Sequence, residues 1–135
     1  MAGKLFQLKI VSPDRIFYED DVDMVEFTSS EGEMGVYADH IPLTTVLVPG
    51  IMTIHKEGEI KKAALHAGFA EILQDSVTIL AEVAEWPEEF DLNRANEARI
   101  RAERRLGGTS GEADINLLRA ELALKRSLTR IKLLS

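Results

Sequence analysis

Apolar and polar residues alternate along most of residues 1–85. Phe6, Leu8 and Ile10 alternate with Gln7 and Lys9, which is the pattern of a strand that buries one face. Similar short runs follow, separated by turns rich in Gly, Pro, Asp or Ser. These runs are 15–18, 22–27, 35–37, 43–48, 51–55, 60–65, 69–73 and 77–84. Such a succession of short strands and turns predicts an antiparallel sandwich or barrel.

The last third of the chain has a helical pattern instead. Pro87 has no backbone N–H to donate to a sheet, so it ends the alternating region. Asp91 stands where an N-cap belongs, and residues 92–106 are rich in the helix formers Ala, Arg, Glu and Leu. The glycine-rich residues 107–111 separate this helix from a second one between residues 114 and 135. Two short helices joined by such a loop predict an antiparallel hairpin.

Each predicted helix carries a row of arginines. Steps of seven and four residues keep the members of a row on one helical face. They are Arg94, Arg101 and Arg105 on the first helix, and Arg119, Arg126 and Arg130 on the second. If the two rows face each other, they repel unless an anion lies between them. If they face water, Glu97, Glu103 and Glu121 are their natural partners. The spacing alone leaves both interpretations open.

Each helix also has a side suited to packing. Small residues let another helix approach closely, and on the first helix these are Ala95, Ala98 and Ala102. On the second helix we expect a stripe of larger apolar residues to be buried. Its members are Leu117, Leu124, Leu128 and Ile131. Because isolated helices of about 15 residues are marginal in water, the hairpin depends on packing, and its alanine face buries little area.

The composition is that of a globular protein, with 45% hydrophobic and 29% charged residues and no cysteine. Residues 1–85 carry six Lys or Arg against fifteen Asp or Glu, a net charge of −9, whereas residues 86–135 carry ten against eight, a net charge of +2. The acidic body would repel nucleic acid and anionic membranes. We find no run of the ~20 apolar residues that a membrane span needs, and no signal or transit peptide, so we expect a cytoplasmic setting.

No arrangement of residues indicates catalysis. The three histidines, His40, His55 and His66, lack the spacing of metal ligands, and the sequence contains neither a nucleophile elbow nor a P-loop. We therefore predict neither catalytic nor metal-binding residues. His40 is expected to anchor a loop as a hydrogen-bond donor, and His55 is expected to be solvated.

Three stretches resemble the epsilon subunit of bacterial F-type ATP synthase. Residues 31–43 read E-G-E-M-G-V-Y-A-D-H-I-P-L, which is similar to the family's G-x-x-G-V-x-x-x-H-x-P-L signature. Residues 68–71 (G-F-A-E) and 5–15 resemble two of its strands, although Ala67 stands where many members have a second glycine. The resemblance implies an antiparallel β-sandwich of about ten strands in residues 1–86, followed by a C-terminal α-helical hairpin in residues 87–135.

This resemblance implies a non-catalytic central-stalk (rotor) subunit of the proton-translocating ATP synthase. Its sandwich would bind the gamma subunit and the ring of c subunits. Its mobile hairpin would inhibit ATP hydrolysis when it extends into the alpha/beta catalytic head. The implied location is peripheral, on the cytoplasmic face of the bacterial cell membrane, with no direct membrane insertion and no nucleic-acid partner.

Some bacterial members of this family bind ATP in the folded hairpin through a motif I/L-D-x-x-R-A. The matching stretch here is Phe90-Asp91-Leu92-Asn93-Arg94-Ala95, with Phe90 in place of the aliphatic residue. By the same resemblance, the other ligand positions are Glu85, Arg101, Arg126 and Arg130. ATP would be a regulatory ligand, and no catalytic cofactor is implied.

Two other functions match parts of the sequence. The basic hairpin could bind nucleic acid, but no aromatic residue follows Phe90 to stack on bases, and the acidic body opposes such binding. An enzyme with a carboxylate pair or a histidine base needs convergent polar groups in a pocket, which the sequence does not supply. A mitochondrial relative is disfavoured because the N-terminal residues do not read as a transit peptide.

Overall fold

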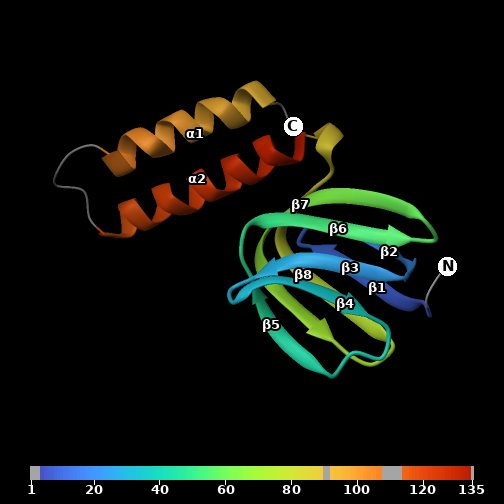
Figure 1. The fold of residues 1–135 in the computed structure, drawn as a ribbon. Coiled ribbons are helices and arrows are strands. Elements are labelled where there is room, and N and C mark those ends of the chain that lie inside the picture. Colours follow the sequence, from blue (N-terminus) through green and yellow to red (C-terminus); the bar gives the residue numbers. More distant parts are fainter. Residues whose placement is uncertain (1–3, 90–91, 108–113, 135) are drawn as a thin grey trace.

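The computed structural model describes residues 4–89, 92–107 and 114–134, and consists of a β-sandwich followed by two helices (Figure 1). The strands are β1 (Phe6–Ser12), β2 (Arg15–Val22), β3 (Met24–Ser29), β4 (Gly32–Tyr37), β5 (Leu43–Leu47), β6 (Gly50–Lys56), β7 (Glu59–Ile72) and β8 (Ser76–Glu85). A single-turn 3₁₀ helix, η1 (Pro87–Glu89), leads to α1 (Leu92–Gly107) and α2 (Asp114–Leu134). The predicted order, a sandwich and then a helical hairpin, is confirmed.

The strands form one sheet that folds over itself into two layers (Figure 1). Its order is β2-β1-β8-β7-β5-β3-β4, and β6 pairs with both β3 and β7. The described pairs are antiparallel except for β1 and β8, which run parallel and place Leu8 opposite Val77. The sandwich therefore has eight strands rather than about ten, and one of its pairs is parallel.

A single long strand, β7, explains part of the difference in strand number. We predicted two strands, 60–65 and 69–73, where the structure has one strand of 14 residues. The register of β7 with β8 is the same on both sides of Ala67, while the other edge of β7 passes from β6, which pairs up to Leu65, to β5, which pairs from Gly68 onward.

The backbone at this change of partner is unusual at two residues, both with positive φ. Gly68 has φ of +138°, and a Cβ atom there would lie 1.9 Å from the carbonyl oxygen of Leu80, so only glycine fits. Ala67 has φ of +54°, in the left-handed region that costs a residue with a side chain about 1–2 kcal/mol. The chain thus accepts local strain at Ala67 in order to continue the strand.

The inward-facing side chains of the two layers form one apolar core. Leu8 and Ile10 of β1 and Ile79 of β8 are completely buried, as the alternating pattern predicts. The buried cluster is drawn from residues 6–84 of the described chain. Because the sandwich closes its own core, we expect it to be stable without the helices.

The two helices pack against each other through small residues. Ala95 and Ala102 of α1 and Ala120 and Ser127 of α2 are at most 3% exposed. Figure 1 shows that only one end of the hairpin reaches the sandwich: α2 packs on β6, β7 and η1, while α1 packs on α2. The predicted alanine face is therefore the helix–helix contact, with Ala98 half-buried beside it.

The larger apolar residues of α2 are less buried than we predicted. Leu124 and Ile131 are half-buried, and Leu128 is 46% exposed. Small residues allow the helices to approach closely, which leaves the longer side chains at the rim of the contact. We therefore expect packing to hold the two helices together only weakly.

Two of the histidines can be compared with their predicted roles. His40 donates from Nδ1 to the carbonyl oxygen of Ile41, at 2.7 Å, so its role as a loop donor is confirmed. The prediction that His55 is solvated is wrong, because its ring is half-buried and its Nε2 lies 3.0 Å from Glu26 Oε2 on the adjacent strand. The pattern of β6 alone could not predict this contact, because Glu26 lies on the neighbouring strand β3.

Candidate functional site

The end of β8 and η1 join the sandwich to the hairpin. Trp86 stacks on Phe17 of β2 with ring centroids 4.3 Å apart, and meets Tyr18 edge-on at 6.2 Å. Arg15 of β2 donates from Nη2 to Glu89 Oε1 at 2.8 Å. These contacts hold η1 on the sandwich and fix the direction in which the chain leaves it.

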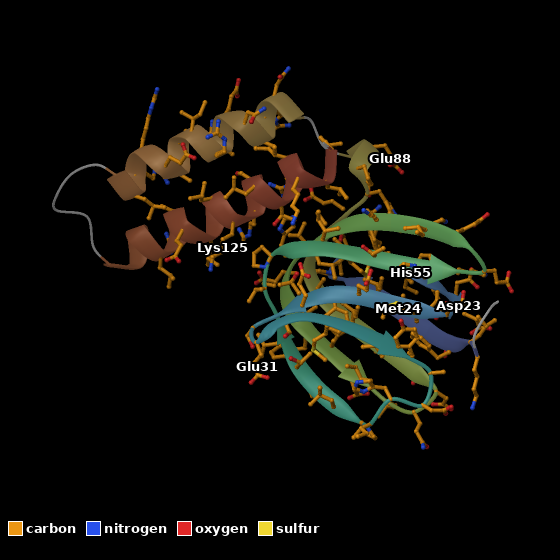
Figure 2. All side chains as sticks on the ribbon, viewed as in Figure 1. Asp23, Met24, Glu31, His55, Glu88 and Lys125 are labelled. Atoms are coloured by element: carbon orange, nitrogen blue, oxygen red, sulfur yellow. The ribbon has the colours of Figure 1, made fainter. Side chains whose placement is uncertain are left out.

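A cleft of about 850 Å³ opens between η1, α1 and the C-terminal part of α2, within the size range of small-molecule sites. It is lined by Glu85, Glu88, Glu89, Arg94, Ala95, Glu97, Ala98, Arg101 and Arg130. Glu88 marks this junction in Figure 2. The cleft therefore draws its lining from the sandwich end and from both helices.

The structure brings together most, but not all, of the residues expected to form a site. Those that line the cleft are Glu85, Arg94, Ala95, Arg101 and Arg130. Arg126 is not among the lining residues, and its Nη2 lies 3.7 Å from Glu82 Oε2. Phe90 and Asp91 lie outside the described residues. Arg105 and Arg119 are exposed and also outside the lining, so the two arginine rows share the cleft over only part of their length.

Glu85 is the polar centre of the junction. Its Oε1 lies 2.7 Å from Arg130 Nε and 3.0 Å from His66 Nε2, so both groups donate to the same oxygen. Burial alone would raise the pKa of Glu85, but the hydrogen bonds from His66 and Arg130 outweigh it and hold the pKa below its ordinary value. The carboxylate thus stays charged and ties α2 to β7 and β8.

The two arginines that α1 contributes to the cleft have no such partner among the described residues. Arg94 and Arg101 form no hydrogen bond or ion pair with any residue that the structure describes. Among the carboxylates of the lining, Glu89 is already held by Arg15, whose hydrogen bond lowers the pKa of Glu89. Two guanidinium groups therefore face the cleft with their charge available.

The chemistry of this lining suits anion binding. Guanidinium groups form charge-assisted, often bidentate hydrogen bonds with phosphate, and carboxylates accept hydrogen bonds from hydroxyl or amino groups. Among the described residues, the lining side chains are those of Glu, Arg and Ala, with no Ser, Thr, Cys or Lys to act as a nucleophile. Within the described ranges, no group of His, Cys, Asp and Glu is placed to hold a metal ion.

A second surface feature lies on the sandwich. Val46, Phe69 and Leu80 are direct neighbours across β5, β7 and β8, and they are 47%, 55% and 53% exposed. We call these three residues the apolar patch. Adjacent exposed apolar side chains of this size are typical of surfaces that bind another protein. None of the helices in the described residues is long and apolar enough to cross a membrane.

Sequence reasoning missed one residue of the junction altogether. His66 is completely buried and makes a direct contact with Glu85, yet we assigned it no role. A histidine within the apolar run Ala63-Ala64-Leu65 was a signal that a polar partner must lie nearby. Its partner could not be named, because Glu85 is 19 residues away in the chain.

Comparison with known proteins connects this architecture with one family. The model of the ATP synthase delta/epsilon chain β-sandwich domain matches residues 5–87, and that of its long α-helix domain matches residues 88–135. The ATP synthase epsilon chain of Caldanaerobacter subterraneus subsp. tengcongensis is 44% identical over 133 residues, covering 98% of this chain and 95% of the relative. That of Halalkalibacterium halodurans is 43% identical over 124 residues, covering 92% of each chain.

Solved structures show the same fold at lower identity. A chain of the Euglena gracilis mitochondrial ATP synthase, solved as OSCP/F1/c-ring, superposes with a TM-score of 0.86 at 23% identity, covering 100% of this chain and 84% of that one. The sequence relatives confirm the resemblance drawn from the signature residues, and with it the expectation of a non-catalytic subunit. The chain belongs to the delta/epsilon chain family of the ATP synthase.

Proposed function

We propose that this chain is a rotor subunit of a bacterial proton-translocating ATP synthase, in which the sandwich links the gamma subunit to the c-ring. The relatives named above are bacterial epsilon chains, and a chain of the same fold occurs in an F1/c-ring assembly. The subunit would lie on the cytoplasmic face of the cell membrane, peripherally and without inserting into it.

The apolar patch supports this placement, because it offers the sandwich a surface for a protein partner. We expect Phe69→Lys to prevent co-purification with gamma and the c-ring without altering the melting temperature, since Phe69 is 55% exposed. Ile60→Lys is a matched control, because Ile60 is 58% exposed on the same strand but outside the patch. Normal assembly of the Phe69→Lys synthase would show that another surface binds the rotor.

The hairpin adds regulation to this structural role. It would inhibit ATP hydrolysis when it leaves the sandwich and extends toward the alpha/beta head, and ATP would hold it in the docked form. One observation carries the nucleotide assignment: Arg94 and Arg101, without partners among the described residues, share a cleft with Arg130 and Glu85. A phosphate group between them would relieve the repulsion of the guanidinium groups and provide charge-assisted hydrogen bonds.

The energies involved are of the right size for a switch. A ligand that binds only the docked form adds about 2.7 kcal/mol at a hundredfold excess over its dissociation constant. That is enough to move a balanced equilibrium to about 99:1. Because the hairpin reaches the sandwich at only one end (Figure 1), we expect the docked form to be weak enough for such a ligand to control.

Isothermal titration calorimetry with ATP tests this assignment. Arg94→Ala and Arg130→Ala should each weaken binding at least tenfold, because losing one charge-assisted contact costs about 1.5–3 kcal/mol. Arg105→Ala is the matched control, since this arginine belongs to the row of α1 but lies outside the cleft. The absence of heat from the wild type at millimolar ATP would overturn the nucleotide assignment.

Arg126 separates two versions of this proposal. The family resemblance places it among the ligands, whereas here it lies outside the cleft lining. If Arg126→Ala weakens ATP as strongly as Arg130→Ala, α2 must shift when the nucleotide binds. If its effect is small, the cleft already has its binding geometry.

Truncation tests the inhibitory role independently of ATP affinity. A synthase whose chain ends at residue 89 retains the complete sandwich and η1. We expect it to assemble and to remain coupled, with a higher rate of ATP hydrolysis than the wild type. An unchanged rate of hydrolysis would remove the inhibitory role while leaving the rotor role intact.

A further inference from the structure

The junction between sandwich and hairpin contains one acceptor that serves two potential cations. Arg130 Nε and His66 Nε2 both donate to Oε1 of Glu85, at 2.7 and 3.0 Å. Arg130 belongs to α2, while His66 and Glu85 belong to the sandwich strands β7 and β8. The contact that holds α2 in place is therefore shared with a group that can gain a proton.

The second ring nitrogen of His66, Nδ1, is buried where no hydrogen-bond partner is available among the described residues. Its side chain is completely buried, and Nδ1 has no hydrogen-bond partner within the described part of the chain. Since Nε2 faces a carboxylate, it carries the hydrogen when the ring is neutral, and Nδ1 is the site that a further proton would occupy. A proton there would place a charge in a dry position without an acceptor.

The other groups around this site make that added charge more costly while α2 is docked. From α2 come Arg130 and also Arg126, whose Nε is buried without a hydrogen-bond partner among the described residues. Glu85 is the carboxylate that β8 contributes in direct contact, and Glu82 of the same strand is drawn toward Arg126.

The remaining elements of the junction contribute two carboxylates, and among the described residues neither is paired with Arg126 or Arg130. Glu88 and Glu89 come from η1, and Glu89 is engaged by Arg15 of β2. The end of β6 beside β7 consists of the uncharged Gly50 and Ile51.

If α2 left the sandwich, the factors that make a charge on His66 unfavourable would be removed. It would take both arginines away, uncover β7 and leave Glu85 to His66 alone. A protonated His66 is thus compatible with the released hairpin and unfavourable with the docked one. Histidine is the side chain that ordinarily changes charge between about pH 5 and 8.

We propose that His66, Glu85 and Arg130 form a proton-sensitive latch, in which neutral His66 lets Glu85 hold Arg130 and α2, and protonated His66 displaces them. The inference rests on the proposed function only in assuming that the hairpin moves between docked and released forms. It adds an input that is independent of nucleotide: acidification releases the hairpin. In the synthase, release would place the hairpin in the inhibitory position.

The distance between α2 and the sandwich measures this directly in the full chain. The protein has no cysteine, so Lys125→Cys on α2 and Glu31→Cys on the β3–β4 turn, both labelled in Figure 2, can carry a fluorophore pair. Without nucleotide, the docking constant in the labelled wild type should fall as the pH is lowered from 8 to 5.5. One proton linked to release gives at most a tenfold change per pH unit.

The variants identify the group responsible. His66→Gln keeps an N–H donor for Glu85 but cannot gain a proton, so its docking should not vary with pH over this range. His40→Gln, in the exposed β4–β5 loop, should respond like the wild type. If His66→Gln fails to fold, Glu85→Gln serves instead: the hairpin should be released to a similar extent at all pH values.

Several outcomes would overturn the latch. These are a wild-type distance that does not change with pH, a hairpin that stays docked or released throughout, or a pH response that persists in His66→Gln. Because the distance is measured without ATP, its dependence on pH tests the latch independently of the nucleotide assignment. Loss of ATP binding in calorimetry would leave the pH response standing, and a flat pH response beside normal ATP binding would refute only the latch.

Discussion

Arg130→Ala should detach α2 from the sandwich without unfolding the sandwich. The contact to Glu85 is short, at 2.7 Å, and the side chains of Arg130 and Glu85 are only 25% and 19% exposed, so solvent screens it little. Removing one partner of a buried pair typically costs 3–5 kcal/mol when the other charge is stranded. Here Glu85 keeps its bond from His66, so the cost should be nearer that of one charge-assisted hydrogen bond, about 1.5–3 kcal/mol.

Hydrogen exchange of backbone amides is the appropriate assay, because it resolves local opening from global unfolding. A loss of about 1.5–3 kcal/mol corresponds to a reduction in protection of roughly 10- to 160-fold. This reduction should be confined to α1 and α2, while amides of β1 and β8 keep their protection. Arg119→Ala is the control, because Arg119 is an exposed arginine of the same helix. Unchanged protection of α2 in Arg130→Ala would mean that apolar packing, and not Glu85, holds the hairpin.

Three further predictions concern the parts of the fold on which this site depends. Gly68→Ala should lower the free energy of unfolding by about 3 kcal/mol, because its Cβ would meet the carbonyl oxygen of Leu80. Ala67→Gly should instead raise the free energy of unfolding by up to about 1 kcal/mol, because glycine adopts the left-handed conformation without strain. Urea denaturation measures both changes. The pKa of Glu85 is lowered in the folded chain, so its own contribution to hairpin stability is present above its unfolded pKa and lost as the pH falls through the folded one. In a His66→Gln background, which removes the latch, helix melting with Glu85 and with Gln at this position should therefore converge only as the pH falls below about 4.5. A fragment of residues 1–89 should melt cooperatively by circular dichroism, and a non-cooperative, dye-binding fragment would contradict the independence of the sandwich.

The sandwich was predictable from local pattern, and its departures from the prediction come from non-local contacts. Leu8 and Ile10 are buried as their alternation requires. The parallel pairing of β1 with β8 joins residues about 70 positions apart. The alternation of apolar and polar residues within each strand does not indicate which strand will be its partner. Gly68 indicates a break between strands, because glycine often marks turns, yet β7 continues through it and keeps its register with β8.

The candidate site was predictable where it depends on helical periodicity. The steps between Arg94 and Arg101 place both on one face of α1, and the structure directs both to the cleft. Periodicity does not say how far a neighbouring helix extends, so it could not show that Arg105 and Arg119 lie beyond the cleft. It also could not show that Arg126 points toward Glu82, because that contact depends on where α2 meets β8.

The way the hairpin is attached explains why it could respond to small chemical changes. An apolar interface would hold α2 in proportion to the area it buries, at about 25 cal/mol per Å², and neither ATP nor a proton would alter that area. Here only one end of the hairpin reaches the sandwich (Figure 1), and Glu85 supplies a polar contact whose strength depends on the charges beside it. A phosphate beside Arg130 or a proton on His66 would change the free energy of that contact. The sandwich, whose core contains no residue of the helices, would keep its proposed partners in either position of the hairpin.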